Sequence, residues 1–418
     1  MIKIKKFKGQ KGLNKLEQFL EKRRSSQMNI IPIVSKILKD IKKNKKKALL
    51  KYEKKFSNNS VIKPNKTEIN KASKSLSPKI KKAIDFAYNR IFKYHSLQKL
   101  SNIFYKDKLN NSFKYKSVPL NKIGIYVPAN LPSTLMMNAI PAMIAGVKNI
   151  VLANPRLSGR INPAVMYVAK KCKIKKIISV GGAQAIGSLA YIQKVDKIFG
   201  PGNDFVARAK REVFGDVGIE GMIAGPSEIT VVADKLLDMS KVITSMIAQS
   251  EHGINSQSIL ITKNEKLIKI INKKINIYIK KMPRKNIVIQ SLKKNGLLIL
   301  AKINQQIVNI INIISPEHLE LLSKDYKKLL SNIYNVGSIG LGIYSPVAAS
   351  DYNVGTNHTL GTLGSARFAS GLNLNDFYKK ISRFTLSKKG IEVIGKQAIT
   401  LAEYENLYAH ALSIKSRL

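Results

Sequence analysis

Apolar residues change their spacing near residue 120 of this 418-residue chain. Before that point they recur three and four residues apart, which is typical of helices with one apolar face, over Leu13–Arg23, Ile30–Tyr52, Thr67–Ser75 and Pro78–Leu97. Ser77-Pro78 has the residue types of a helix start, with a hydroxyl at the cap and a proline in the first turn. The pattern predicts an N-terminal helical, lysine-rich segment over residues 1–120.

From Lys122 onward, short apolar runs alternate with helical patterns. The runs typical of buried strands are Ile123–Val127, Ile150–Ala153, Ile177–Val180, Lys197–Phe199 and Ile229–Ala233. The helices predicted between them are Leu135–Val147, Pro163–Cys172, Ala183–Tyr191 and Phe205–Val213. Because such alternation is typical of a parallel sheet with helices on both faces, we predict a first Rossmann-like domain over residues 121–235.

A second alternating stretch follows. Its predicted elements are helices at residues 239–252 and Leu267–Lys281, strands at Ser258–Thr262, Asn286–Gln290 and Leu297–Leu300, and an apolar run at Val308–Ile314. Residues 345–375 are rich in Gly, Ser and Asn, as functional loops often are, and Thr400–Ala411 has a helical pattern. The predicted fold class is therefore α/β, with two doubly wound Rossmann-like units, the second over residues 236–375, and a C-terminal helical tail over residues 376–418.

The net charge is +48, from 73 Lys and Arg against 25 Asp and Glu. A basic balance of this size is typical of nucleic-acid-binding proteins. The excess is uneven, however, since it is +26 over residues 1–120 and −2 over residues 181–260. Lys, Ile and Asn, which have A/T-rich codons, are abundant throughout. We therefore favour genomic base bias as the cause, and expect at most non-specific binding to nucleic acid.

Cysteine and hydropathy limit the remaining classes. Cys172 is the only cysteine, which excludes an intramolecular disulfide and a zinc site made of several cysteines. The charged residues Met1–Lys6 are followed by no apolar segment, so no signal peptide is expected. No run approaches the roughly 18–20 apolar residues of a membrane span. We expect a cytoplasmic protein with no membrane partner.

Four of the five histidines lie in short polar motifs, whereas His95 falls in the basic segment and is expected at the surface. Gln249 and His252 share a face if their segment is helical, and an amide oxygen with an imidazole can bind a divalent ion; the same residues also fit a helix end with Gly253. Asp351 and His358 can meet at a metal or a substrate, although Asp351 also fits an Asx turn.

Two further motifs combine an acid with a histidine. In Glu317-His318 each group can shift the pKa of the other, which suits general acid–base catalysis; Ser315 and Pro316 also fit the start of a helix. Glu405 and His410 fit a solvent-exposed terminal helix equally well. The mixed nitrogen and oxygen donors suited to zinc are Gln249, His252, Asp351 and His410. Gly181–Gln184 follows a strand and opens a helix, which suits a nucleotide phosphate.

Taken together, these motifs resemble those of the histidinol dehydrogenase family. The stretches that carry the resemblance are Val180–Gly187 (VGGAQAIG), Phe199–Asn203 (FGPGN), Ala224–Glu228 (AGPSE), Ala248–His252 (AQSEH), Ser315–Leu321 (SPEHLEL), Asp351–His358 (DYNVGTNH), Ala366–Gly371 (ARFASG) and Leu407–His410 (LYAH). Each motif is weak alone, but eight in order at similar intervals are hard to obtain by chance. The resemblance implies two NAD-dependent oxidations, of L-histidinol to an aldehyde and then to L-histidine, with one zinc ion per subunit.

The resemblance also implies roles for individual residues. The implied zinc ligands are Gln249, His252, Asp351 and His410, and the zinc would hold the substrate. The implied general base is His318, and Glu317 would activate water at the aldehyde stage. The implied substrate contacts are Ser227, His318, His358 and Glu405 together with the zinc ligands. The implied NAD contacts are Tyr126, Gln184 and Asn203. A homodimer is implied as well, with Glu405 and His410 acting in the site of the partner subunit.

One segment departs from the family pattern. The family usually has a Gly pair after Tyr-x-Pro, whereas here Tyr126-Val127-Pro128 is followed by Ala129-Asn130 and the segment is shortened. Glycine lets a backbone approach a ligand more closely than alanine or asparagine does. Two alternatives to the enzyme hypothesis follow from the observations so far, a basic nucleic-acid-binding protein and a related protein that has lost activity.

Overall fold

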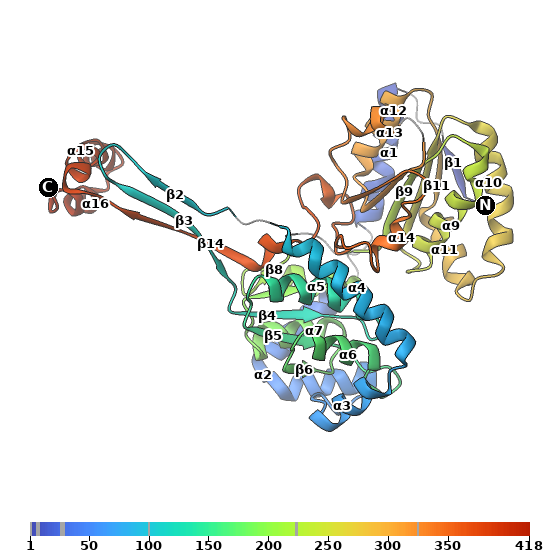
Figure 1. Cartoon of the computed structure of the whole chain (residues 1–418), viewed down its shortest axis with the longest axis horizontal. Coiled ribbons are helices and arrows are strands. Elements are labelled where there is room, and N and C mark those ends of the chain that lie inside the picture. Colours follow the sequence, from blue (N-terminus) through green and yellow to red (C-terminus); the bar gives the residue numbers. More distant parts are fainter. Residues whose placement is uncertain (1, 6–8, 26–29, 99–100, 222–224, 324–325) are drawn as a thin grey trace.

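The computed structural model describes residues 2–5, 9–25, 30–98, 101–221, 225–323 and 326–418. Figure 1 shows two α/β bodies and an arm that extends from one of them to a pair of C-terminal helices. The chain is thus an α/β protein with two parallel sheets and one antiparallel sheet. No helix in the described part of the chain is both long and apolar enough to cross a membrane.

The first body is built on a five-stranded parallel sheet with the order β6-β5-β4-β7-β8. Its strands are β4 (Lys122–Tyr126), β5 (Asn149–Ala153), β6 (Lys176–Ile178), β7 (Lys197–Phe199) and β8 (Gly218–Ile219). Its helices are α2 (Ile31–Ser57), α3 (Lys66–Ser75), α4 (Pro78–Ser96), α5 (Pro132–Ile144), α6 (Pro163–Lys171), α7 (Gly182–Gly187), with the π-helical turn η2 (Ser188–Ile192), and α8 (Asp204–Val213). Apolar residues of α4, α5 and α6 pack on one face of the sheet, and those of α2, α7 and α8 on the other.

The second body is built on a six-stranded parallel sheet with the order β1-β11-β10-β9-β12-β13. Its strands are β1 (Lys3–Lys5), β9 (Glu228–Val232), β10 (Gln257–Thr262), β11 (Leu297–Leu300), β12 (His318–Leu321) and β13 (Ser338–Leu341). Its helices are α1 (Gly9–Ser25), α9 (Met239–Ser250), α10 (Glu265–Ile279), α11 (Lys285–Asn295), α12 (Asn304–Ile314), α13 (Tyr326–Leu330) and α14 (Val347–Ser350), and short 3-10 turns lie at η3 (Leu236–Asp238) and η4 (Ser365–Arg367). A further 3-10 turn, η5 (Leu374–Phe377), packs its Leu374 and Phe377 side chains into the core of the first body.

Both faces of the second sheet are also covered, as its strand β10 illustrates. Leu260 faces a core formed with α9, α10 and α11, while Ile259 and Ile261 face a core formed with α1 and α12. Successive residues of a strand point to opposite faces, so a strand buried on both sides is mostly apolar. This explains apolar runs such as Ile259–Ile261 in β10, whereas β12, although buried along its length, carries His318 and Glu320.

The arm is a three-stranded antiparallel sheet that ends in two helices. Its strands pair in the order β14 (Tyr378–Thr385), β3 (Ser112–Pro119) and β2 (Ile103–Lys106), and the helices are α15 (Lys388–Tyr404) and α16 (Tyr408–Lys415). Figure 1 shows these two helices at the far end of the arm, away from both bodies. Strands β2 and β14 are almost entirely exposed along their length.

Several elements differ from the sequence-based prediction. The segment 1–120 contains three strands besides its helices, and β1 and α1 belong to the second body rather than the first. The tail after residue 375 begins with the strand β14, and its helical part is broken between α15 and α16. Asn286–Gln290, predicted as a strand, lies within α11, because a five-residue apolar run does not distinguish the two periods.

Candidate active site

Glu317 and His318 lie at the amino end of β12, in the middle of the six-stranded sheet. The prediction that Ser315 caps the start of a helix is wrong: Ser315 ends α12 in the left-handed conformation, at φ 49°. The chain then enters β12, which is buried along its whole length. An acid and a histidine are therefore placed inside the protein, where burial shifts the pKa values of both.

The Glu317 carboxylate is anchored by its neighbours. The backbone N–H of Glu228 donates to Oε2 of Glu317 at 2.8 Å, and Nε2 of Gln249 lies 3.5 Å from the same atom. Burial raises the pKa of Glu317 well above its usual value; the Glu228 and Asp351 charges raise it further, while the Glu228 N–H and Arg23 lower it. A carboxyl group with a raised pKa is suited to donating or accepting a proton in catalysis.

The His318 imidazole is a buried base. Its Nε2 atom lies 3.9 Å from Oε1 of Glu317 and 3.8 Å from Oδ1 of Asp351. Burial, reinforced by His358 and His252, lowers the pKa of His318 to about 3. Its Nδ1 atom is buried and has no hydrogen-bond partner among the described residues. A neutral imidazole with an unused nitrogen can accept a proton from a bound molecule.

The Gly-rich loop brings Asp351 and His358 together, as expected. Asp351 follows α14, and its carbonyl oxygen lies 2.7 Å from Nδ1 of His358. Burial raises the pKa of Asp351 to about 7 and lowers the pKa of His358 to about 4. Asn357 fixes the loop, because its side-chain amide is buried and donates to the Met137 carbonyl of α5 at 2.6 Å.

His95 is not at the surface, so that prediction is wrong. It is fully buried at the end of α4, because the helix turns this face toward the Gly-rich loop. Its Nε2 atom lies 3.3 Å from Nδ2 of Asn357, and its Nδ1 atom lies 3.0 Å from Oε1 of Gln98. His95 thus supports the residue that precedes His358, in a role that charge and composition did not indicate.

The end of α9 supplies Gln249 and His252. Gln249 is buried against Glu317, while His252 is exposed. Desolvation by the surrounding protein atoms lowers the pKa of His252. The charge of a protonated His252 in turn lowers the pKa values of His318 and His358. Ser227 precedes Glu228 at the start of β9. The fold therefore brings the expected site residues that lie between positions 227 and 358 to one edge of the six-stranded sheet. They are Ser227, Gln249, His252, Glu317, His318, Asp351 and His358.

The donor set fits a metal ion, but it is incomplete within one chain. Among the described residues, no three His, Cys, Asp or Glu side chains already form a metal-binding group. Burial of the Asp351 carboxylate raises its pKa, because the charged form is poorly solvated there. A cation beside it would offset the free energy lost by desolvation. Glu405 and His410 do not reach this site: Glu405 directly follows α15 and His410 lies within α16, at the far end of the arm (Figure 1).

The expected nucleotide contacts lie at the carboxyl edge of the other sheet. Tyr126 ends β4, and Asn203 follows β7 and caps α8, accepting the N–H of Val206 at 3.1 Å. Gln184 of α7 is buried. Gly200 follows β7 at φ +104°, and a Cβ there would lie 2.0 Å from the Tyr126 carbonyl. Glycine is thus required where the two strand ends meet.

Two charged residues of the site region, Glu53 and Arg23, were missed by the sequence analysis. Glu53 of α2 is fully buried and accepts from Nε2 of Gln184 at 3.1 Å and from the N–H of Gly181 at 3.3 Å. Arg23 of α1 pairs with Glu228, and both side chains are nearly buried. A charged residue in a lysine-rich helix gives no local signal of burial, although the acid of the motif Ala224–Glu228 was visible; Ala224 itself lies outside the described residues.

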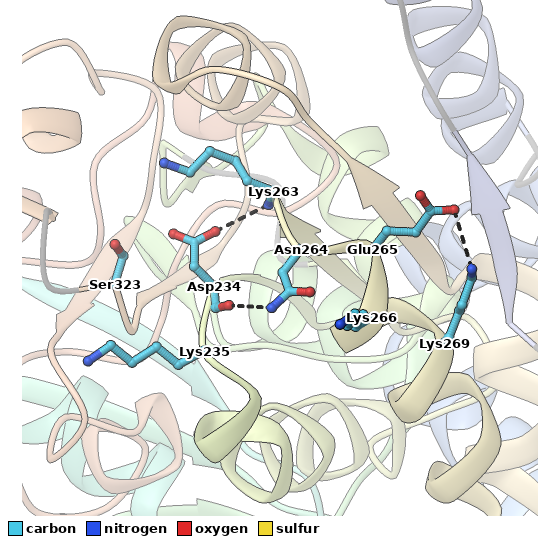
Figure 2. A pocket seen from close by; sticks show the side chains of 8 residues that line it. All are labelled: Asp234, Lys235, Lys263, Asn264, Glu265, Lys266, Lys269 and Ser323. Atoms are coloured by element: carbon cyan, nitrogen blue, oxygen red, sulfur yellow. Dashed lines mark hydrogen bonds and ion pairs between the residues drawn. The ribbon is translucent and has the colours of Figure 1, made fainter.

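A separate pocket lies at the opposite, carboxyl edge of the six-stranded sheet. Four of the residues that line it are lysines. Figure 2 shows the whole lining, which consists of Asp234, Lys235, Lys263, Asn264, Glu265, Lys266, Lys269 and Ser323. Its volume is about 880 Å³. Within the lining, the Asp234 carboxylate accepts the backbone N–H of Lys263 at 3.2 Å, and Glu265 forms an ion pair with Lys269 at 3.9 Å. None of the expected site residues lines this pocket.

Comparison with known proteins gives a consistent result. The sequence model of the histidinol dehydrogenase family matches residues 20–418. A histidinol dehydrogenase of Pelagibacter ubique is 53% identical over 426 residues, covering 100% of this chain and 99% of that protein. One from Acinetobacter baylyi is 38% identical, covering 93% of each. The crystal structure of histidinol dehydrogenase from Elizabethkingia anophelis superposes with a TM-score of 0.91 at 36% identity, covering 100% of this chain and 98% of that one.

Proposed function

Because the chain belongs to the histidinol dehydrogenase family, we propose that the residues gathered around His318 form the active site of this oxidoreductase of histidine biosynthesis. The reaction is the oxidation of L-histidinol to L-histidine by NAD in two steps, through the aldehyde. The observation that carries the assignment is the buried His318 imidazole, with a lowered pKa and an unused Nδ1 atom. No other imidazole in the site combines full burial with an unused nitrogen.

His318 acts as the general base. With its pKa near 3 before ligands bind, the imidazole is neutral at physiological pH, so it can take the alcohol proton while hydride leaves for NAD. Glu317, whose pKa is raised by burial, exchanges a proton with the water that attacks the aldehyde in the second step. Ser227 and His358 contact the substrate from the two sides of this pair. The low dielectric around both groups strengthens these interactions.

Zinc is held by Gln249, His252 and Asp351 of one subunit with His410 of the partner subunit. A mixed set of imidazole, amide and carboxylate donors suits this ion, and the buried Asp351 carboxylate supports a cation at this place. When bound, zinc supplies a Lewis acid that fixes the imidazole and amino groups of the substrate. With zinc bound, Asp351 remains ionised and His252 neutral, as metal ligands must be.

NAD binds at the carboxyl edge of the five-stranded sheet. The order β6-β5-β4-β7-β8 supports a Rossmann-like unit. From β4 the chain adds β5 and β6 on one side and then β7 and β8 on the other, so the order of strands reverses between β4 and β7. Ligands bind outside the carboxyl ends of the strands at such a point. Tyr126, Asn203 and Gln184 contact the dinucleotide there. The shortened segment after Pro128 is supported by Asn154, whose side chain donates to the carbonyls of Val127 at 3.0 Å and Pro128 at 3.1 Å.

The enzyme is a cytoplasmic homodimer in which each arm completes the partner's site, with Glu405 and His410 acting there. The arm leaves large apolar side chains open to solvent: Phe104 is 67% exposed, Tyr404 85% and Leu412 67%. Apolar surface of this kind is usually covered by a partner. The arm also separates α16 from the site of its own chain, which supports donation to a second subunit.

Turnover measurements test the chemistry directly. Purified protein is mixed with L-histidinol and NAD, and NADH is followed by absorbance, before and after chelation and zinc addition. About two NADH per histidinol, lost on chelation and restored by zinc, is the expected result for a metal-dependent two-step oxidation. Turnover that is indifferent to chelation would contradict the zinc site, and no turnover from a zinc-loaded dimer would contradict the proposed function.

Mixing two inactive variants tests the shared site. The His318→Ala and His410→Ala proteins carry their defects on opposite sides of a shared site, so each mixed dimer has one intact site. Randomly remixed subunits should regain about a quarter of wild-type activity, since half of the dimers are mixed and each has one active site of two. Mixing His318→Ala with Glu317→Gln, which lie in one chain, is the control and should restore nothing. Equal failure of both mixtures would contradict donation in trans.

A further inference from the structure

Arg23 lies in the N-terminal helix α1, far in sequence from every residue of the active site. Its guanidinium group nevertheless ends among the loops that carry the site. It forms an ion pair with the Glu228 carboxylate, in which the side chains are only 9% and 3% exposed. Its Nη2 atom also donates to the carbonyl oxygen of Asn255 at 3.0 Å and lies 3.5 Å from that of Pro226.

The three residues that Arg23 contacts lie within three positions of a proposed site residue in the sequence. Pro226 and Glu228 flank Ser227, the proposed substrate contact, and Asn255 lies three residues after His252, the proposed zinc ligand. A guanidinium group presents its five donors in a rigid plane, so one side chain can hold several acceptors at fixed relative positions. Arg23 therefore joins the loop after α9 to the start of β9.

Glu228 extends this connection to the rest of the site. Its Oε1 atom accepts the N–H of Leu363 at 3.0 Å, in the loop that follows His358, and its own N–H donates to Glu317 at 2.8 Å. The loop is packed tightly here, since a Cβ on Gly225 would lie 2.7 Å from Oγ1 of Thr362. The pair thus links the segments of Ser227, His252, Glu317 and His358.

We infer that Arg23 is a positioning residue of the active site, which acts through Glu228 and Asn255 to fix the substrate and zinc groups relative to one another. The inference rests on the proposed site. A neutral hydrogen-bonding residue cannot replace Arg23, because the Glu228 carboxylate would remain buried without its cation, which is strongly unfavourable. Lysine keeps the charge but not the planar donor geometry, so it replaces Arg23 only in part.

The test compares Arg23→Met and Arg23→Lys with a matched control elsewhere. Arg156 forms a similar ion pair with Glu68 in the first body, with side-chain exposures of 8% and 31%, and it touches none of the proposed site residues. We expect Arg23→Met to raise the KM for histidinol and to weaken zinc binding, each by about ten-fold or more, as loss of supporting contacts does. Arg156→Met should change neither, and Arg23→Lys should lie between Arg23→Met and wild type.

A double variant separates positioning from loss of folding. If Arg23 acts through Glu228, Arg23→Met and Glu228→Gln are not additive, and Arg23→Met/Glu228→Gln should fold while losing no more activity than the worse single variant. The KM for NAD should stay within about two-fold of wild type, because NAD binds the other body.

The outcomes also separate this inference from the proposed function. Wild-type protein without zinc-dependent turnover would overturn the proposed function, and Arg23 would then have no site to position. Wild-type turnover together with a folded Arg23→Met variant that keeps its histidinol KM and zinc affinity would overturn the role of Arg23 alone. Equal losses in Arg23→Met and Arg156→Met, with KM for NAD rising in both, would identify a general structural role and would also overturn it.

Discussion

The two bodies share one strand order but place their polar residues at opposite edges. Apart from β1, the order β11-β10-β9-β12-β13 of the second sheet repeats the order β6-β5-β4-β7-β8 of the first. In the first sheet the expected ligand contacts, Tyr126 and Asn203, follow the carboxyl ends of the central strands. In the second, Ser227 and His318 lie at the amino ends of β9 and β12.

The carboxyl edge of the second sheet shows what the difference means. At the position equivalent to Tyr126 and Asn203, the second body has the lysine-lined pocket with its paired acids (Figure 2). Its amino edge instead carries buried ionisable groups whose pKa values are shifted by burial. Strand order determines which loops are neighbours, but the side chains at each edge determine where chemistry is supported. The proposed cofactor contacts thus fall in one body and the proposed acid–base groups in the other.

The largest effect that we expect is a difference in kinetics between an alanine variant in each body, with kcat lowered by one and the KM for NAD raised by the other. His318→Ala should lower kcat by about 10²–10⁴-fold, the usual contribution of a general base, while NAD still binds. Gln184→Ala should mainly raise the KM for NAD. Steady-state kinetics with both substrates measure the split. A His318→Ala variant that loses NAD affinity and keeps kcat would break the assignment of the two edges.

The first body has a buried ion pair of its own, between Lys210 and Glu220, beside the proposed NAD site. Lys210 donates to the Gly200 carbonyl and to Glu220, with side-chain exposures of 5% and 0%. Lys210→Met leaves Glu220 buried without a cation, so the free energy of unfolding should fall by about 3–5 kcal/mol, and the KM for NAD should rise as the Gly200 turn loosens. Urea unfolding and kinetics check both. The variant Lys210→Met/Glu220→Leu should recover most of the stability but not the NAD affinity.

Acid should destabilise the second body through its neutral histidines. The pKa of His318 is lowered to about 3 in the folded protein. Below pH 6.5 the unfolded chain therefore binds a proton that the folded protein excludes, and the free energy of unfolding decreases as the pH is lowered. The advantage of wild type over His318→Asn should therefore shrink by about 2 kcal/mol between pH 6.5 and 5. Urea unfolding of both zinc-free proteins at the two pH values tests this. A constant difference would mean that His318 is protonated in the folded protein.

The smallest effect expected is the response of the first body to loss of zinc. Cys172 follows α6 in the first core, and burial raises the pKa of its thiol to about 12. A thiol in this state is unreactive, so alkylation of Cys172 reports opening of the first body. Chelation should leave the alkylation rate within about two-fold, because local openings follow separate cooperative units. Rapid labelling after chelation, measured by mass spectrometry, would show that the two bodies open together.

Many helices and strands could be predicted from local sequence patterns alone. The strands at Lys197–Phe199 and Leu297–Leu300 were predicted at their observed bounds, and the start of α4 at Ser77 was predicted with its cap, where Oγ of Ser77 accepts the Ile80 N–H at 3.4 Å. These features depend on local residue types and on a period that repeats along the chain. The motifs also indicated residues that meet around Glu317, because histidines are scarce in this chain and recur beside acids and amides, and because those motifs resemble the family's.

Other features depend on contacts between segments that are far apart in the sequence. β1 pairs with β11, some 290 residues later, and Arg23 reaches Glu228 across 205 residues of the chain; neither has a local signal among many exposed lysines. The burial of His95 depends on the loop that packs against it, and the arm strands β2 and β14 become strands only by pairing with β3. Periodicity shows which face of an element is apolar, whereas burial of a charged side chain depends on partners that the fold brings from elsewhere.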